Sequence, residues 1–103
     1  MQLEGLRIEG RGGKYDNALK CFTGASLVAV RCELAGNQAN FSDEGTRGEL
    51  RDCTALDSKG NGLFVFGGAA VAMDGGAVRG CAKQGVYVVD DGTHVSVRAV
   101  LSA

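Results

Sequence analysis

Short runs in which apolar and polar residues alternate recur along the chain at intervals of about 22 residues. Alternation with a period of two indicates a β-strand with one buried face. The clearest series consists of the apolar pairs Leu6 and Ile8, Val28 and Val30, Gly48 and Leu50 as a weaker member, Val71 and Met73, and Val95 and Val97. Because these pairs return at a nearly constant interval, the chain is predicted to repeat one structural unit.

Two further series of residues recur at the same interval as the apolar pairs. Side-chain amides recur at Asn17, Gln38, Asn61 and Gln84, and a small residue follows each of them. A third series consists of the pairs Cys32 and Leu34, Cys53 and Ala55, and Gly76 and Val78. The second repeat carries Asn40 and Ser42 where its neighbours carry apolar residues. We therefore expect its register to shift by one residue, which places Phe41 inward.

Three short strands per repeat, separated by Gly, Asn and Asp, are what one coil of a parallel solenoid requires. Helices would need longer apolar runs with a period of 3.6, and 17 glycines among 103 residues disfavour them. The segment 49–76, ELRDCTALDSKGNGLFVFGGAAVAMDGG, resembles the repeats of the right-handed parallel β-helix (pectate-lyase-like) superfamily.

The resemblance covers residues 6–100 and implies an all-β fold, a right-handed parallel β-helix of four to five coils. No linker divides the chain, so residues 1–103 are predicted to form a single β-helix domain. The superfamily includes lyases, glycosidases, epimerases, phage tailspikes and non-catalytic interaction domains. The resemblance therefore predicts the fold of this chain, but it does not select one activity.

Charge and hydropathy exclude several kinds of partner. Eleven Lys and Arg against twelve Asp and Glu give a net charge of -1, without the basic excess that nucleic-acid binding needs. No apolar run approaches the roughly 20 residues that span a bilayer, and the N-terminal segment lacks a signal-peptide core. We expect a cytoplasmic protein that binds neither nucleic acid nor membrane.

The residues that could carry chemistry are sparse. The spacing of Cys21, Cys32, Cys53 and Cys81 fits neither a zinc knuckle nor a compact disulfide framework, so we expect reduced cysteines that fill the core. His94 is the single histidine, and we expect no metal site and no cofactor. No nucleophile motif of the GxSxG type is present. We assign no catalytic residue and favour a protein that is not an enzyme.

Stacking of coils would bring equivalent side chains to about 4.8 Å from one another. The four amides are therefore predicted to form a ladder of hydrogen bonds along the solenoid axis. We favour this structural role over contact with a polar ligand.

An outward series of charged residues follows the first apolar series, at Glu9, Arg31, Arg51, Asp74 and Arg98. Such a strip could recognise uronates, so Arg31, Arg51, Asp74 and Arg98 are the candidate binding residues. The interpretation that we favour is a solvated face with charge pairing between strands. The acidic pairs at matching turns, Asp43 with Glu44 and Asp90 with Asp91, are similarly interpreted as turn residues rather than as a pair of catalytic carboxylates.

The sequence favours a non-catalytic structural or protein-interaction module. The alternative is a carbohydrate-binding or polysaccharide-cleaving β-helix related to pectate lyases, although the short loops would not wall a cleft. Neither end carries a cap of helix-forming length, and the C-terminal segment stays apolar. We expect a homo-oligomer that forms through the terminal coils, with Val95, Val97, Val100 and Leu101 in the interface. A protein or polysaccharide partner is the other possibility.

Overall fold

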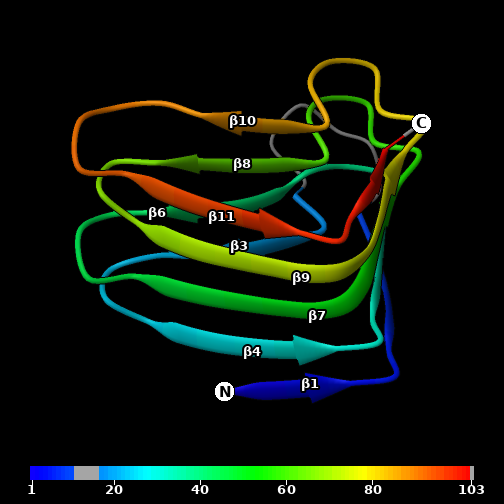
Figure 1. Cartoon of the computed structure of the whole chain (residues 1–103), viewed down its shortest axis with the longest axis horizontal. Coiled ribbons are helices and arrows are strands. Elements are labelled where there is room, and N and C mark those ends of the chain that lie inside the picture. Colours follow the sequence, from blue (N-terminus) through cyan, green and yellow to red (C-terminus); the bar gives the residue numbers. More distant parts are fainter. Residues whose placement is uncertain (11–16, 103) are drawn as a thin grey trace.

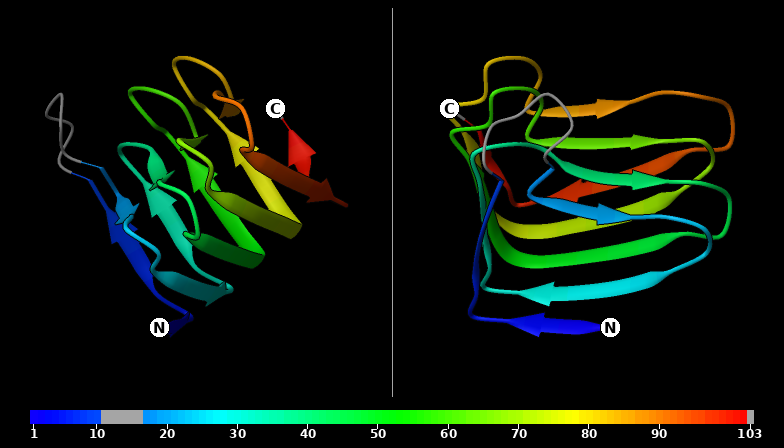
Figure 2. Two further views of the ribbon diagram at one scale, coloured as in Figure 1. Left: turned by 90° about the vertical axis from the view of Figure 1, so that its left-hand side faces the viewer. Right: turned by 180° about the vertical axis from the view of Figure 1, so that it is seen from behind.

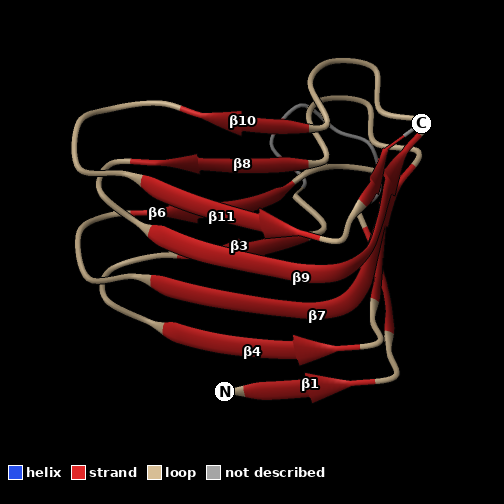
Figure 3. Ribbon diagram, in the orientation of Figure 1, coloured by secondary structure: helices blue, strands red, loops and turns tan. Residues whose placement is uncertain are grey.

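The computed structural model of the chain describes residues 1–10 and 17–102. Their regular secondary structure is entirely β, without a helix (Figure 3). The strands are β1 (Gln2–Glu4), β2 (Arg7–Glu9), β3 (Leu19–Cys21), β4 (Ser26–Val30), β5 (Glu33–Ala35), β6 (Ala39–Ser42), β7 (Arg47–Leu56), β8 (Leu63–Phe66), β9 (Ala70–Arg79), β10 (Val86–Val88), β11 (His94–Arg98) and β12 (Leu101–Ser102). Among the described residues there is consequently no helix that could cross a membrane.

The described strands pair in parallel and form two sheets (Figure 1). The small sheet has the strand order β10, β8, β6, β3, and the large sheet contains the other eight strands. Each pairing joins strands of adjacent coils, so the chain winds into a solenoid of about four turns. Figure 2 shows these coils stacked along one axis. The predicted all-β parallel solenoid is confirmed.

The large sheet bends through a corner once in every coil. β7 and β9 pass through this corner as continuous strands of 10 residues, whereas β4 and β5 are separate strands. The equivalent corner residues all have a left-handed φ, at Gly5 (66°), Arg31 (52°), Asp52 (53°), Gly75 (73°) and Ala99 (54°). With the small sheet, the two arms of the large sheet give the three strand segments per coil that the sequence predicts.

One inward series of the large sheet contains Leu3, Ala29, Leu50, Met73 and Val97, which are paired in register from coil to coil. The positions of Leu50, Met73 and Val97 agree with the sequence prediction. Ala29, Leu50 and Met73 are buried, so this series forms the part of the core that packs against the inner face of the large sheet.

The sequence prediction for the first two coils is wrong. In the second coil Leu27 and Ala29 are the buried residues, and Val28 and Val30 alternate with them on the outer face. The segment SLVAV is apolar at four consecutive positions, so its composition does not determine which residues face inward. Leu6 and Ile8 lie beyond the corner of the first coil, where Ile8 pairs with Leu34 rather than with Val30.

Phe41 lies inward in the second coil, as predicted, and its side chain is fully buried. It pairs with Val65 in β8, and its ring reaches across the core to Gly48 in β7. A Cβ atom built at Gly48 would lie only 2.4 Å from Cε2 of Phe41. The weak member of the first apolar series is therefore a glycine because the aromatic ring fills the space of its side chain.

The amide ladder is present over three coils. Asn61 Nδ2 donates to Gln38 Oε1 at 3.2 Å, and the backbone N–H of Asn61 donates to the same oxygen at 3.3 Å. The backbone N–H of Gln84 in turn donates to Asn61 Oδ1 at 3.0 Å. One detail differs from the prediction, because Gln38 lies one residue later in its coil than the other amides do. Ala18 N–H donates to Gln38 O, and this bond places Gln38 opposite the residue that follows Asn17.

We expect Asn61→Leu to lower the free energy of unfolding by about 1 to 3 kcal/mol, because the Gln84 N–H would lose its acceptor and Gln38 Oε1 would keep only the backbone N–H of residue 61 as a donor. Asn61 is buried, so water would replace these bonds only incompletely. Urea denaturation gives the difference. Lys59→Ala, two residues away on the exposed surface, is the control. Equal free energies of unfolding for the two variants would show that the amide ladder does not stabilise the fold.

Candidate functional site

Three of the four candidate binding residues lie side by side on the outer face of the large sheet. Arg51, Asp74 and Arg98 occupy consecutive positions in register, on β7, β9 and β11. Arg51 is held by its own strand, since its Nε and Nη2 donate to Glu49 Oε1 at 3.0 Å and 2.6 Å. The predicted charged strip is therefore real over three coils, with Asp74 between two arginines.

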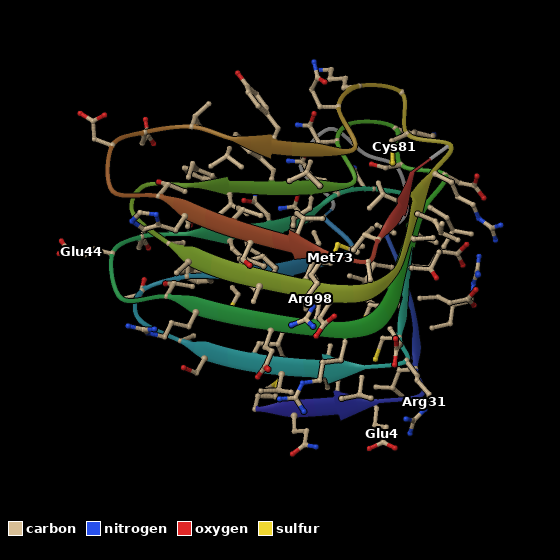
Figure 4. All side chains as sticks on the ribbon, in the orientation of Figure 1. Glu4, Arg31, Glu44, Met73, Cys81 and Arg98 are labelled. Carbon is tan, nitrogen blue, oxygen red and sulfur yellow. The ribbon has the colours of Figure 1, made fainter. Side chains whose placement is uncertain are left out.

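The predicted place of Arg31 is wrong, because Arg31 does not belong to this strip. Val30 takes the position next to Arg51, and Arg31 lies at the corner of the coil with a left-handed φ of 52°. There its guanidinium forms an ion pair with Glu4 (Figure 4). Glu9 is likewise absent from the strip, since it pairs with Ala35 on the other arm of the large sheet.

A groove of about 600 Å³ runs beside the charged strip, across β4, β7, β9 and β11. Small and aliphatic residues of consecutive coils line much of it, together with a few longer polar side chains. The lining includes Ser26, Arg47, Glu49, Ala70, His94 and Ser96. His94, the single histidine, thus lies in the same groove as Arg47 and Glu49.

The acidic turn residues hold neighbouring coils together. Asp43 Oδ2 accepts the backbone N–H of Thr23 at 2.9 Å, and Asp90 Oδ2 accepts that of Gly67 at 2.9 Å. The threonines three residues later repeat the pattern, because Thr46 and Thr93 accept the N–H groups of Gly24 and Gly68. These bonds explain why the sequence Asp-x-Gly-Thr occurs twice, and they support the interpretation of the acids as turn residues. Glu44 projects from the first of these turns (Figure 4).

The cysteines behave as core residues. All four are free, and Cys21, Cys32 and Cys53 are buried. Burial raises the pKa of the Cys53 thiol, which also donates to Ala29 O at 3.3 Å. Within the described ranges, no group of three or more His, Cys, Asp or Glu side chains is arranged to hold a metal ion.

The last coil presents core-facing side chains to solvent. Val97 continues the inward series above Met73, yet it is 51 % exposed whereas Met73 is 2 % exposed. Val95 and Val100 pack partly against the core cluster beside it. Leu101 differs from these three valines. It is 75 % exposed and pairs with Ala77, so it belongs to the outer face and not to the end of the core.

The outer face of the small sheet carries a cluster of aromatic side chains that the sequence pattern did not predict. Phe64 stacks on Tyr87 with ring centroids 5.3 Å apart, and Phe64 also contacts Phe66 at 4.7 Å. The alternation in β8 contains the signal, because Leu63 and Val65 are buried and Phe64 and Phe66, which alternate with them, must then face outward.

Together, the parallel coils, the charged strip and the exposed valine end define a small β-solenoid. Comparison of the chain with protein-family models, with curated proteins and with solved structures found no match.

Proposed function

We propose that this chain is a non-catalytic protein-interaction module that self-associates through its terminal coil. The observation that carries the proposal is the exposure of Val97 above a fully packed core. Exposed apolar surface next to unpaired strand edges favours association with another chain. Val95 and Val100 extend the same surface, and all three residues were selected as interface residues from the sequence.

The chemistry of the described surface supports a binding role over catalysis. Asp43 and Asp90 are engaged by backbone N–H groups, and Arg51 is engaged by Glu49. Neither arrangement presents a nucleophile beside a general base.

We expect the unmodified chain to show a molar mass above that of one chain at micromolar concentrations, and Val97→Lys to remain monomeric. The new ammonium group would have to lose its water if the interface formed, and such desolvation without a partner is costly. Val97 is half exposed, so the substitution leaves the packed core intact. Light scattering after size exclusion gives the mass, and circular dichroism checks that the variant is folded.

Leu101→Lys is the matched control, because it adds the same charge to the same coil on the outer face. It should associate like the unmodified chain. A monomeric unmodified chain, or equal loss of association in both variants, would refute self-association through the valine surface.

A second candidate function is carbohydrate binding, which the groove beside Arg51, Asp74 and Arg98 favours. The groove crosses four stacked strands along the solenoid axis, as an extended glycan would require, and its lining includes Arg47 and His94, which could contact acidic sugars. A glycan array probed with the Val97→Lys variant tests it. Saturable binding that is lost on Arg98→Ala would support this second function.

A further inference from the structure

The centre of the amide ladder is a chemically labile dipeptide. Asn61 is followed by Gly62, and asparagine is among the thermolabile residues of proteins. Its lability is greatest before glycine, because glycine has no side chain to hinder the approach of its own nitrogen to Cγ of the asparagine. The other asparagines, Asn17, Asn37 and Asn40, precede alanine, glutamine and phenylalanine. The chain therefore carries one asparagine in the most reactive sequence context.

The fold requires both residues of this dipeptide. Asn61 supplies a donor to Gln38 and an acceptor to the backbone of Gln84. At Gly62 two coils approach each other closely, since a Cβ atom there would lie 2.6 Å from the backbone oxygen of Gly85. A less labile pair of residues at these positions would consequently either break the ladder or force the coils apart.

The contacts between coils also hold the groups that would react with each other. The N–H of Gly62, which contains the attacking nitrogen, donates to Gln84 O at 2.9 Å. The side-chain amide of Asn61 is fixed by its Nδ2 bond to Gln38 at 3.2 Å and by the bond that its Oδ1 accepts at 3.0 Å. Asn61 is only 6 % exposed, so water has little access to it. Reaction within the dipeptide therefore requires that the third coil first loses its hydrogen bonds to the neighbouring coils.

The ladder contains a second amide before glycine, and it is of the resistant type. Gln84 precedes Gly85 and is exposed. Because its side chain is one carbon longer than that of asparagine, the corresponding ring has six members instead of five and closes far more slowly. The labile amide thus occupies the buried position of the ladder, and the exposed position before glycine carries the resistant amide.

We propose that Asn61 is a site of spontaneous, irreversible modification by water, at a rate set by opening of the solenoid at the amide ladder. The nitrogen of Gly62 forms a bond to Cγ of Asn61, the bond from Cγ to Nδ2 breaks, and ammonia leaves with the proton of the Gly62 nitrogen. The product is a succinimide ring. Water then adds across one of the two ring bonds to this nitrogen. Cleavage at Cγ gives aspartate, and cleavage at the backbone carbonyl carbon gives isoaspartate.

Either product disables the ladder at its centre. A carboxylate oxygen replaces the Nδ2 donor and would face Gln38 Oε1, so that two acceptors meet without a hydrogen between them. Isoaspartate also inserts one carbon into the main chain two residues before β8, which disturbs the register of that strand with its neighbours. A chain that is modified while the ladder is open therefore cannot restore the native ladder.

The first test compares the folded and the unfolded chain. The chain is incubated at mildly alkaline pH in native buffer and in denaturing guanidinium chloride, and peptide mapping by mass spectrometry follows each asparagine. We expect conversion in denaturant to be fastest at Asn61, and conversion in native buffer to be at least about tenfold slower, because hydrogen-bonded segments react only through rare local opening. Asn17, Asn37 and Asn40 are internal controls. Equal rates in the two conditions, or an intact Asn61 in denaturant, would overturn the proposal.

The second test opens the ladder without altering the dipeptide. Gln38→Leu removes the acceptor in the second coil, and in native buffer it should raise the rate at Asn61 by about threefold to tenfold, the effect of one lost hydrogen bond. Lys59→Ala, two residues from Asn61 on the exposed surface, should react like the unmodified chain. In denaturant all three chains should react at one rate, since their dipeptides are identical. Equal native rates for the two variants would show that the ladder does not control the reaction.

The third test asks whether the modification is permanent in its effect. Chains converted in part in denaturant are returned to native buffer, and the folded fraction is isolated by size exclusion and mapped again. This fraction should be depleted of chains modified at Asn61, and equal content in the folded and misfolded fractions would contradict the proposal. The first and third tests need no variant, so they stand even if Gln38→Leu does not fold. All three concern single chains and succeed or fail independently of self-association.

Discussion

Phe41→Ala should lower the free energy of unfolding by about 3 to 5 kcal/mol, the largest effect expected from a side-chain truncation in this chain. Phe41 is the largest of the fully buried side chains, and it fills the space between the small sheet and Gly48 of the large sheet. Because coils constrain each other on both sides, the backbone has little freedom to close the resulting cavity. Chemical denaturation measures the loss.

The complementary change is at Gly48. Gly48→Leu alone should destabilise the chain by overpacking against the ring of Phe41, by about 1 to 3 kcal/mol. In the Phe41→Ala background the same leucine enters the vacated volume, so the double variant should be more stable than the sum of the single effects allows. Additivity of the two changes within about 0.5 kcal/mol would contradict the direct contact between these positions.

We expect Gly76→Ala to destabilise the chain by about 2 to 5 kcal/mol, the sum of a left-handed backbone cost and an overpacking cost. Gly76 has a φ of 92°, and a Cβ atom there would lie 1.9 Å from the backbone oxygen of Cys53 in the preceding coil. The atom that it meets belongs to the backbone of β7, so a side-chain rotation cannot relieve the clash. Thermal unfolding should show the loss directly.

Gly92→Ala separates the two contributions. Gly92 has a similar left-handed φ of 79°, but a Cβ atom there meets nothing within 4 Å. It should therefore show the backbone cost alone, about 1 to 2 kcal/mol. If both alanine variants lose the same stability, close approach between coils is not what requires glycine at position 76.

Sequence periodicity was sufficient for the architecture because neighbouring coils bury the same kinds of residue in the same positions. Phe41 could be assigned inward since its neighbours Asn40 and Ser42 are polar. Where every residue of a strand is apolar, as around Val28 and Val30, the phase of the alternation depends on the length of the preceding turn, which composition does not specify.

The candidate site shows the same limit. Arg51, Asp74 and Arg98 lie in β7, β9 and β11, where the inward residues Leu50, Met73 and Val97 agree with the prediction, so the charged residue that follows each of them faces outward as expected. Arg31 was misplaced because it follows the ambiguous strand by one residue and adopts a left-handed conformation, which is uncommon for a residue other than glycine. The groove could not be foreseen either, since it depends on which side chains on neighbouring strands are small.

The turn bonds of Asp43, Thr46, Asp90 and Thr93 alternate from coil to coil, so the turns come in two kinds, one that accepts and one that donates. Removal of one internal coil, or duplication of any one, would place two turns of the same kind against each other, whereas removal or duplication of two consecutive coils would keep each accepting turn next to a donating one. A solenoid of this type should therefore gain and lose length in pairs of coils, and the pair is the natural unit for recombination and for engineered extension.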